Sequence, residues 1–143
     1  MARVLAIDPG SKRVGIAISD PTGTVATPLG WLPAEPRATL PERLARRARE
    51  EAASELVVGL PWRLDGSQGP EAHAARQLAA ELRRVSRLPV FLVDERLTSV
   101  AAERALLAAG EKRRRRRELS DQVAAALLLQ GHLDSKSGSG RRD

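Results

Sequence analysis

Acidic side chains stand at three places in this 143-residue chain where the sequence pattern changes. Asp8 follows the apolar residues 4–7, Asp94 and Glu95 follow the apolar residues 89–93, and Asp121 opens an apolar stretch that ends near residue 133. Carboxylate oxygens suit Mg²⁺ or Mn²⁺, and such ions activate water and stabilise the leaving oxygen of a phosphodiester, in paired sites about 3.5–4 Å apart. These residue types therefore indicate divalent-metal chemistry on a phosphate ester.

Each acid also has a purely structural interpretation. Asp8 precedes Pro-Gly and can form an Asx turn, Asp94 or Glu95 can form a surface ion pair, and Asp121 can cap a helix. The residues three, four and seven positions after Asp121 are apolar, so Asp121 leads an inward stripe, where a carboxylate needs a cation or a donor. Successive strand residues point to opposite faces, so only one of Asp94 and Glu95 can easily line a common site.

Basic and polar residues near these acids are candidates for holding phosphate. For the cations the alternative is ordinary solvated charge. A glycine-containing loop allows backbone N–H groups to approach phosphate, although a surface turn explains it almost as well. Trp62 suits stacking on an unpaired base or simple packing. The phosphate candidates are Lys12 and Arg13 after the first acid, Ser67 in the loop 66–69, and Arg96 beside Glu95.

The longest run of like charge supplies the whole basic excess of the chain. The sequence has 24 Lys and Arg against 18 Asp and Glu, a net charge of +6. We expect the run to be an extended, mobile connector between two helices that binds a polyanion, the alternative being a solvated connector only. Six phosphate contacts on a duplex would give a slope of log K against log salt of roughly −5. The run comprises Lys112, Arg113, Arg114, Arg115, Arg116 and Arg117.

Composition excludes several classes of site. The absence of cysteine excludes disulfides, thiolate zinc sites, iron–sulfur clusters and cysteine nucleophiles, and two histidines leave little for a histidine metal site. No apolar run approaches the roughly 18 residues of a membrane span, and the N-terminus shows no signal peptide. We therefore expect a cytoplasmic protein with no membrane partner and a core of Leu, Val, Ile and Ala.

Apolar periodicity and turn residues predict the elements that position these side chains. Strands are expected over residues 4–7, 14–18 and 24–32, the third bent or at a sheet edge because of Pro28 and Gly30, and buried strands over 56–60 and 89–93. Helices are expected over 39–53, 71–85, 100–109 and 119–133, the last deeply packed because it is apolar nearly all round. Residues 135–143 are expected to be a disordered tail after a domain of residues 1–134.

This order of elements predicts an α/β fold. An antiparallel meander is continued by parallel strands through helical crossovers, which gives a mixed five-stranded sheet flanked by helices. Ligands on such sheets gather at strand ends, where two of the acidic positions lie.

Four segments resemble the signature blocks of the YqgF/RuvX family, RuvC-like proteins of the RNase H superfamily. The resemblance implies an RNase H-like fold and a Mg²⁺- or Mn²⁺-dependent nuclease whose catalytic metal ligands are Asp8, Glu95 and Asp121, with a metal-activated water as nucleophile. The segments are residues 4–20 (VLAIDPGSKRVGIAISD), 58–61 with 65–70 (VGLP and DGSQGP), 93–98 (VDERLT) and 120–130 (SDQVAAALLLQ).

The resemblance also points to pre-16S rRNA 5′-end processing, with pre-rRNA and ribosomal particles as partners of a monomer or non-covalent homodimer. Related proteins have been proposed as Holliday-junction resolvases, so branched DNA stays open as a substrate. A non-catalytic RNA- or ribosome-binding module would need the basic run but not three acids. Residues 8–13 also resemble the first phosphate loop of actin-type and heat-shock-chaperone ATPases, but those enzymes close two domains over a nucleotide, and this chain supplies one.

Overall fold

The computed structural model describes residues 3–61, 65–95 and 113–142, and in the last range the side chains of residues 122–136. Its five strands form one sheet in the order β3-β2-β1-β4-β5. β2 pairs antiparallel with both β1 and β3, whereas β4 pairs parallel with both β1 and β5. The predicted mixed sheet is confirmed, with strands β1 (Arg3–Asp8), β2 (Arg13–Ser19), β3 (Ala26–Pro33), β4 (Ala53–Leu60) and β5 (Val90–Asp94).

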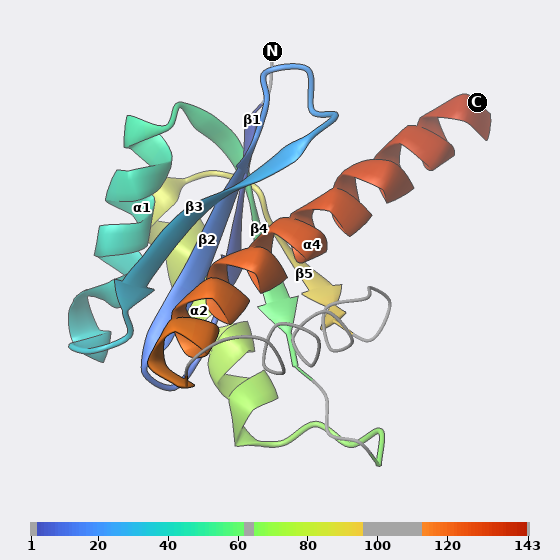
Figure 1. Cartoon of the computed structure of the whole chain (residues 1–143). Coiled ribbons are helices and arrows are strands. Elements are labelled where there is room, and N and C mark those ends of the chain that lie inside the picture. Colours follow the sequence, from blue (N-terminus) through green and yellow to red (C-terminus); the bar gives the residue numbers. More distant parts are fainter. Residues whose placement is uncertain (1–2, 62–64, 96–112, 143) are drawn as a thin grey trace.

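Helices cover both faces of the sheet (Figure 1). The helices α1 (Leu40–Glu50) and α2 (Pro70–Ser86) pack on one face, and α4 (Arg113–Arg142) crosses the other, mainly over β1, β2 and β3. A 3₁₀ turn, η1 (Arg37–Thr39), precedes α1. The protein is therefore a three-layer α/β/α structure.

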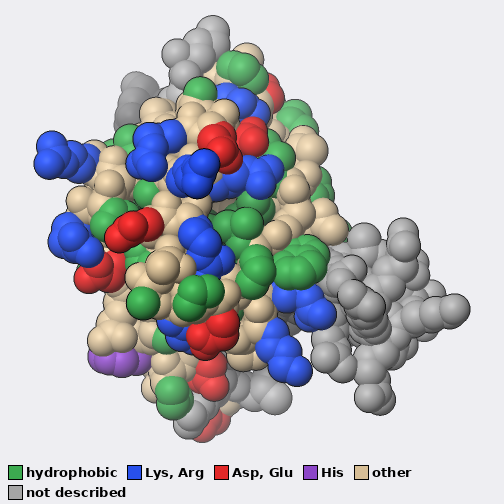
Figure 2. All heavy atoms as spheres, turned by 90° about the vertical axis from the view of Figure 1, so that its left-hand side faces the viewer, with side chains coloured by type: hydrophobic (Ala, Val, Ile, Leu, Met, Phe, Trp, Pro, Cys, Tyr) green, Lys and Arg blue, Asp and Glu red, His purple; other side chains and the backbone are tan. Residues whose placement is uncertain are grey.

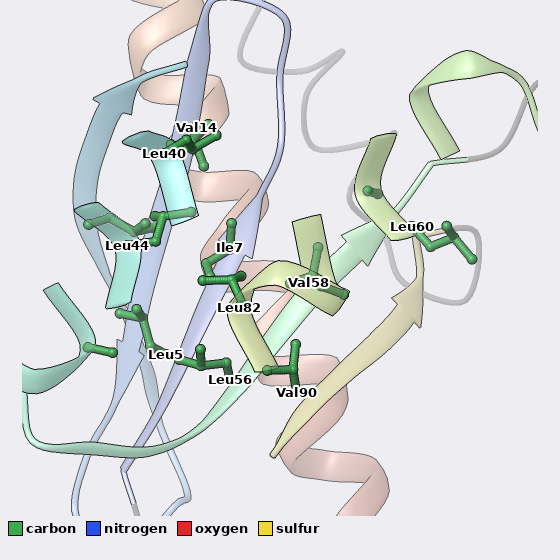
Figure 3. Packing of buried hydrophobic residues seen from close by; sticks show 14 of the residues in the cluster. Leu5, Ile7, Val14, Leu40, Leu44, Leu56, Val58, Leu60, Leu82 and Val90 are labelled. Atoms are coloured by element: carbon green, nitrogen blue, oxygen red, sulfur yellow. The ribbon is translucent and has the colours of Figure 1, made fainter. Parts of the chain in front are cut away.

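Strand alternation divides the core in two, because successive side chains point to opposite faces. The larger core lies under α1 and α2, where Leu5, Ile7, Leu56 and Val58 meet helix residues such as Leu82 (Figure 3). The second core lies under α4 and contains Val4, Ala6, Ala17 and Val57 with Ala124, Ala125, Leu128, Leu129 and Leu133. Any residue of β1 or β4 that shares the alternation of Val4 or Val57 therefore faces α4.

The third strand is at the sheet edge and irregular, as predicted. Ile16 pairs with Gly30 and Ala17 with Pro28, so β3 carries one extra residue at this point, and Gly30 adopts a φ of 120°. A glycine is suited to this conformation because side chains disfavour positive φ.

Two predictions about individual elements are wrong, one about where a helix ends and one about the burial of a strand. Helix α1 ends at Glu50 rather than at residue 53: Ala52 is exposed, adopts a φ of 55°, and leads directly into β4 at Ala53. Strand β5 is only partly buried: Val90 joins the core at 4% exposure, but the strand forms the outer edge of the described sheet and Phe91 is 45% exposed. Both errors arise from apolar residues whose surroundings the local pattern does not specify.

Helix α4 extends beyond the predicted limits at both ends. Arg113 to Arg117 form its first turns, so the expected extended connector is wrong for these residues, and the helix continues to Arg142 through residues expected to form a tail. Arginine is a good helix former, and like-charge neighbours cost only about 0.2–0.5 kcal/mol per pair, which the apolar stripe docked on the sheet easily offsets. Lys112 and the expected helix 100–109 lie outside the described residues, and the domain boundary at residue 134 stays a prediction.

The packing of α4 is deep on one side only. Leu128 and Leu129 are fully buried, whereas Ala126 and Leu127 are partly exposed, so the helix is not enclosed all round. Within the described ranges, no helix is both long enough and apolar enough to cross a membrane.

Candidate active site

Asp8 is a buried carboxylate at the carboxyl end of a central strand. It is the last residue of β1 and is only 2% exposed. Alternation places it on the same face as Val4 and Ala6, which pack under α4. Burial of a charge is costly unless a cation or hydrogen-bond donors stabilise it, so a carboxylate here is suited to holding a cation.

Gly59 brings Asp8 and Glu95 together. It lies on β4, between β1 and β5, and faces α4 because it follows Val57 by two residues. A Cβ at Gly59 would lie 2.9 Å from Glu95 Oε1, 3.5 Å from Asp8 Oδ1 and 3.1 Å from Leu128 Cδ2. The two carboxylates thus reach one point from either side of β4, and Leu128 of α4 closes it.

Gly59 is not among the site residues predicted from the sequence, although it lies in the segment 58–61 that carries the family resemblance. A glycine inside an otherwise apolar strand is a recognised sign of a close approach by another group, and this signal was present. Its function is to leave the space over β4 into which both carboxylates reach.

The structure distinguishes Glu95 from its neighbour. Asp94 pairs with Leu60, which belongs to the core under α1 and α2, so Asp94 takes the face opposite to α4. Glu95 follows it and directs Oε1 to Gly59 on the α4 face. Sequence alternation had left this choice open.

Asp121 lies on α4, seven residues before Leu128. Ala124, Ala125 and Leu128 are all buried against the sheet, so the helical period places Asp121 on the same stripe. In Figure 1 the first turns of α4 lie at the end of the sheet to which β4 points. The Asp121 side chain is outside the described residues, and its role as third ligand stays a prediction.

The described donors fit a divalent cation of the Mg²⁺ class. Asp8 and Glu95 offer hard oxygen ligands over a position without a side chain, and Mg²⁺ is typically held by one or two carboxylates, with waters and substrate phosphates completing its shell. No group of three His, Cys, Asp or Glu side chains suited to a metal occurs among the described residues. A third protein ligand would therefore come from the remainder of the chain.

The predicted phosphate contacts lie in different settings. Lys12 is exposed on the turn after β1, and Arg13 places its guanidinium 5.3 Å from the ring centre of Trp31. The Ser67 hydroxyl and amide both donate to Asp65 Oδ1, at 2.6 and 2.9 Å, and thereby hold the pKa of Asp65 below its ordinary value. Ser67 thus closes its own turn, which is the alternative the sequence left open.

The remaining candidates are not described at the side-chain level. Arg96, Lys112 and Trp62 lie outside the described residues, and residues 113–117 are placed only as the first turns of α4. On the side of the molecule that carries α1, basic and acidic side chains alternate instead of forming a single basic patch (Figure 2). This agrees with a basic excess that is local in the sequence.

Comparison with known proteins identifies close relatives. A family model described as "RuvX: Holliday junction resolvase" matches residues 2–135. A protein of Roseiflexus sp. (strain RS-1) named "Putative pre-16S rRNA nuclease" is 45% identical over 134 residues, which cover 94% of this chain and 95% of the relative. A protein of the same name from Moorella thermoacetica is 45% identical over 138 residues, which cover 96% and 99%.

Solved structures share the fold at low sequence identity. RuvC of Thermus thermophilus, in complex with a Holliday junction substrate, matches with a TM-score of 0.61 and 15% identity over 96% of this chain and 97% of that one. The Fowlpox virus resolvase in complex with Holliday junction DNA matches with a TM-score of 0.57 and 12% identity, over 93% and 97%. The chain therefore has the RNase H-like fold of RuvC-like resolvases, as predicted.

Proposed function

The chain belongs to the RuvX family, and from this premise we propose that it is a divalent-metal-dependent endonuclease that matures the 5′ end of pre-16S rRNA. The observation that carries the proposal is the convergence of the Asp8 and Glu95 carboxylates over Gly59. Relatives named "Putative pre-16S rRNA nuclease", at 45% identity over nearly the whole chain, support the substrate. The reaction is hydrolysis of a phosphodiester bond, and we place it in the cytoplasm with ribosomal particles as partners.

Two acidic side chains at one point argue against a module that only binds RNA. Carboxylates repel the phosphates of a nucleic acid, and like charges close together are unfavourable, so a simple binding surface has no use for this arrangement. A cation held between the carboxylates and a phosphate removes both objections. The carboxylates therefore favour catalysis over binding alone.

The proposed roles follow from the positions of the residues. Asp8 and Glu95 hold the cation, with Asp121 as the expected third ligand. When bound, Mg²⁺ or Mn²⁺ supplies Lewis acidity, which activates water and stabilises the leaving oxygen. Asp8 is fixed at the end of a paired, buried strand, which keeps its oxygens in one orientation. Lys12, exposed on the adjoining turn, is placed to hold a flanking phosphate.

Cleavage of branched DNA is the second candidate, because the family description and the RuvC-like fold both favour it. The two substrates share the phosphodiester chemistry and the same carboxylates. They differ in the shape of the nucleic acid, so a direct comparison of substrates separates them.

The test compares cleavage of a precursor 16S rRNA fragment and a four-way DNA junction in Mg²⁺ and in Mn²⁺. We expect wild type to cleave the RNA, and Asp8→Asn and Glu95→Gln to lose at least about 100-fold in activity, since each replaces an anionic ion ligand with a neutral amide. Asp94→Asn, on the opposite face, is the matched control and should cleave nearly as wild type. The proposal would be refuted if the Asp8→Asn variant still cleaved the RNA, or if neither wild type nor any variant cleaved either substrate. Cleavage of the junction alone would select the second candidate.

A further inference from the structure

Trp31 is an exposed aromatic residue on the edge strand β3. It is 37% exposed, in a chain with two tryptophans, one phenylalanine and no tyrosine. Single exposed apolar residues are normal on protein surfaces, so exposure alone implies nothing. Its position in the sheet and its neighbour are the informative features.

Trp31 shares a cross-strand row with the candidate catalytic carboxylate. It pairs with Gly15 on β2, and Gly15 pairs with Asp8 on β1. Directly paired residues point to the same face, and neighbouring strands are about 4.8 Å apart, so the Trp31 and Asp8 backbones are separated by roughly 10 Å. Gly15 contributes no side chain between them. Trp31 is therefore on the same face of the sheet as Asp8, two strands away from it.

Arg13 gives this aromatic surface a positive charge. Its guanidinium lies 5.3 Å from the Trp31 ring centre, within the range of a cation–π contact, and the exposed Lys12 precedes it in the chain. Aromatic rings together with cations are the means by which proteins bind single-stranded nucleic acid, because the bases stack and the cations neutralise the backbone. The Arg13–Trp31 pair has both properties.

The surroundings of Trp31 do not suit a protein partner. A protein interface has an apolar centre of several side chains. Two other large hydrophobic residues are exposed in the described ranges. Val25 immediately precedes the first residue of β3, whereas Trp31 is near its last, and Phe91 is on the edge strand β5 at the far side of the sheet. Among the residues whose side chains the structure describes, Trp31 is thus an exposed aromatic residue beside cations and without a second large exposed apolar side chain at its end of β3, which favours a nucleotide base.

We propose that the Arg13–Trp31 pair binds an unpaired base of the substrate strand next to the bond that is cleaved, so that the enzyme requires a single-stranded RNA segment at its site. The location of the cut rests on the proposed nuclease function, whereas the stacking of a base does not. Arg13, predicted from the sequence as a phosphate contact, is in this proposal a stacking and charge partner of Trp31.

The test uses the fluorescence of Trp31. A Trp62→Phe, Asp8→Asn background leaves one tryptophan and suppresses cleavage. A single-stranded RNA oligomer from the precursor should quench the emission of Trp31, and the same RNA annealed to its complement should not. In this background, with Kd measured by anisotropy of labelled RNA, Trp31→Ala should weaken binding of the single strand roughly 5- to 100-fold, whereas Trp31→Phe should retain most of the affinity.

Val25→Ala, which removes another exposed apolar side chain near β3, is the matched control and should leave Kd unchanged. Unaltered single-strand affinity in Trp31→Ala, absence of quenching, or equal loss for single strand and duplex would each overturn the inference. Binding is measured without cleavage, so the two proposals fail separately. If single strands quench Trp31 but wild type cleaves neither substrate, only the proposed nuclease function is refuted. Cleavage without quenching would refute only the stacking.

Discussion

Asp8 and Glu95, on the two strands that flank β4, direct carboxylate oxygens to the same point above Gly59. The oxygens lie 3.5 and 2.9 Å from the place where a Cβ of Gly59 would stand. The absence of a side chain at residue 59 is therefore as much a part of the site as the two acids. A cation shared by the carboxylates would relieve their mutual repulsion.

Substitution Gly59→Ala should inactivate the enzyme while leaving it folded. The added methyl group would meet Glu95 Oε1 at 2.9 Å and Leu128 Cδ2 at 3.1 Å, so one of these side chains must move. We expect kcat/KM to fall about 100-fold, because displacements near 1 Å have such effects, and stability to fall by about 1–3 kcal/mol through overpacking.

Val57→Ile is the matched control for that substitution. It adds one methylene on the same strand and the same buried face, where residue 57 pairs with Ala6 and Phe91 and not with the acids, so it should cost stability but not activity. Steady-state cleavage and thermal unfolding of both variants distinguish the two effects. Equal activity losses would show that the face as a whole, and not the space between the acids, is sensitive.

Metal binding should be detectable without any substrate. An ion that binds only the folded state raises stability by about 2.7 kcal/mol at 100 times its Kd, which raises the Tm by several degrees. We expect Mn²⁺ or Mg²⁺ to produce this shift in wild type and in Asp94→Asn, and to produce little in Asp8→Asn. An equal shift in all three proteins would place the ion elsewhere.

The first two acids were predictable because turn chemistry and strand ends are local features. Asp8 closes an apolar run before Pro-Gly, and the structure places it at the end of β1 on the predicted face. The choice of Glu95 over Asp94 came from family resemblance, since alternation shows only that the two residues take opposite faces. The register of β4 and β5, which decides it, is a tertiary property.

The role of Gly59 and the extent of α4 depended on contacts distant in sequence. Gly59 matters because strands β1 and β5 lie on either side of it, and no pattern within residues 56–60 specifies that order. The arginine run suggested an extended connector because local repulsion is visible in the sequence. The contact that stabilises the helix is an apolar stripe docked on the sheet several turns away, and the local sequence does not reveal it.

Glu55 should anchor α4 to β4 in a pH-dependent manner. His132 Nε2 lies 2.9 Å and Lys136 Nζ 3.0 Å from its carboxylate, whose side chain is 14% exposed. Burial raises the pKa of Glu55. The hydrogen bonds from His132 and Lys136 lower that pKa by more than burial raises it, so the net pKa of Glu55 is below its ordinary value. Because the pKa of Glu55 is lower in the folded than in the unfolded state, its carboxylate stabilises the fold above about pH 4.5. This stabilisation is lost as the pH falls through the pKa of Glu55 in the folded state.

Glu55→Gln should therefore destabilise the protein by about 1 kcal/mol at pH 7 and by progressively less below pH 4.5. Urea unfolding at several pH values measures this difference. Glu50→Gln, whose exposed carboxylate lies 3.8 Å from Arg46, is the control and should change stability by less than about 0.5 kcal/mol at every pH. A destabilisation by Glu55→Gln that does not vary with pH would exclude titration of Glu55 as its cause.

The helical form of the arginine run changes its expected contribution to binding. Successive helical residues are rotated by about 100°, so Arg113 to Arg117 surround the helix axis, and only two or three can face one nucleic acid backbone. At about 0.9 per neutralised phosphate, the run should contribute a slope of roughly −2 to −3 in log K against log salt, instead of the −5 expected for an extended segment. Replacing all five with glutamine, which also favours helix, should reduce the measured slope by that amount.

Arg46→Gln with Arg49→Gln on α1, on the opposite face of the sheet from α4, removes two arginines away from the run; it is the control and should leave the slope unchanged. No change in the five-residue variant would remove the run from the binding surface. A reduction near 4.5 would mean that all five arginines contact phosphate, which requires these turns of α4 to unwind when RNA binds. The intermediate result would place a helical cationic segment immediately before Asp121, so that the same element brings phosphate to the acids and supplies the expected third ligand.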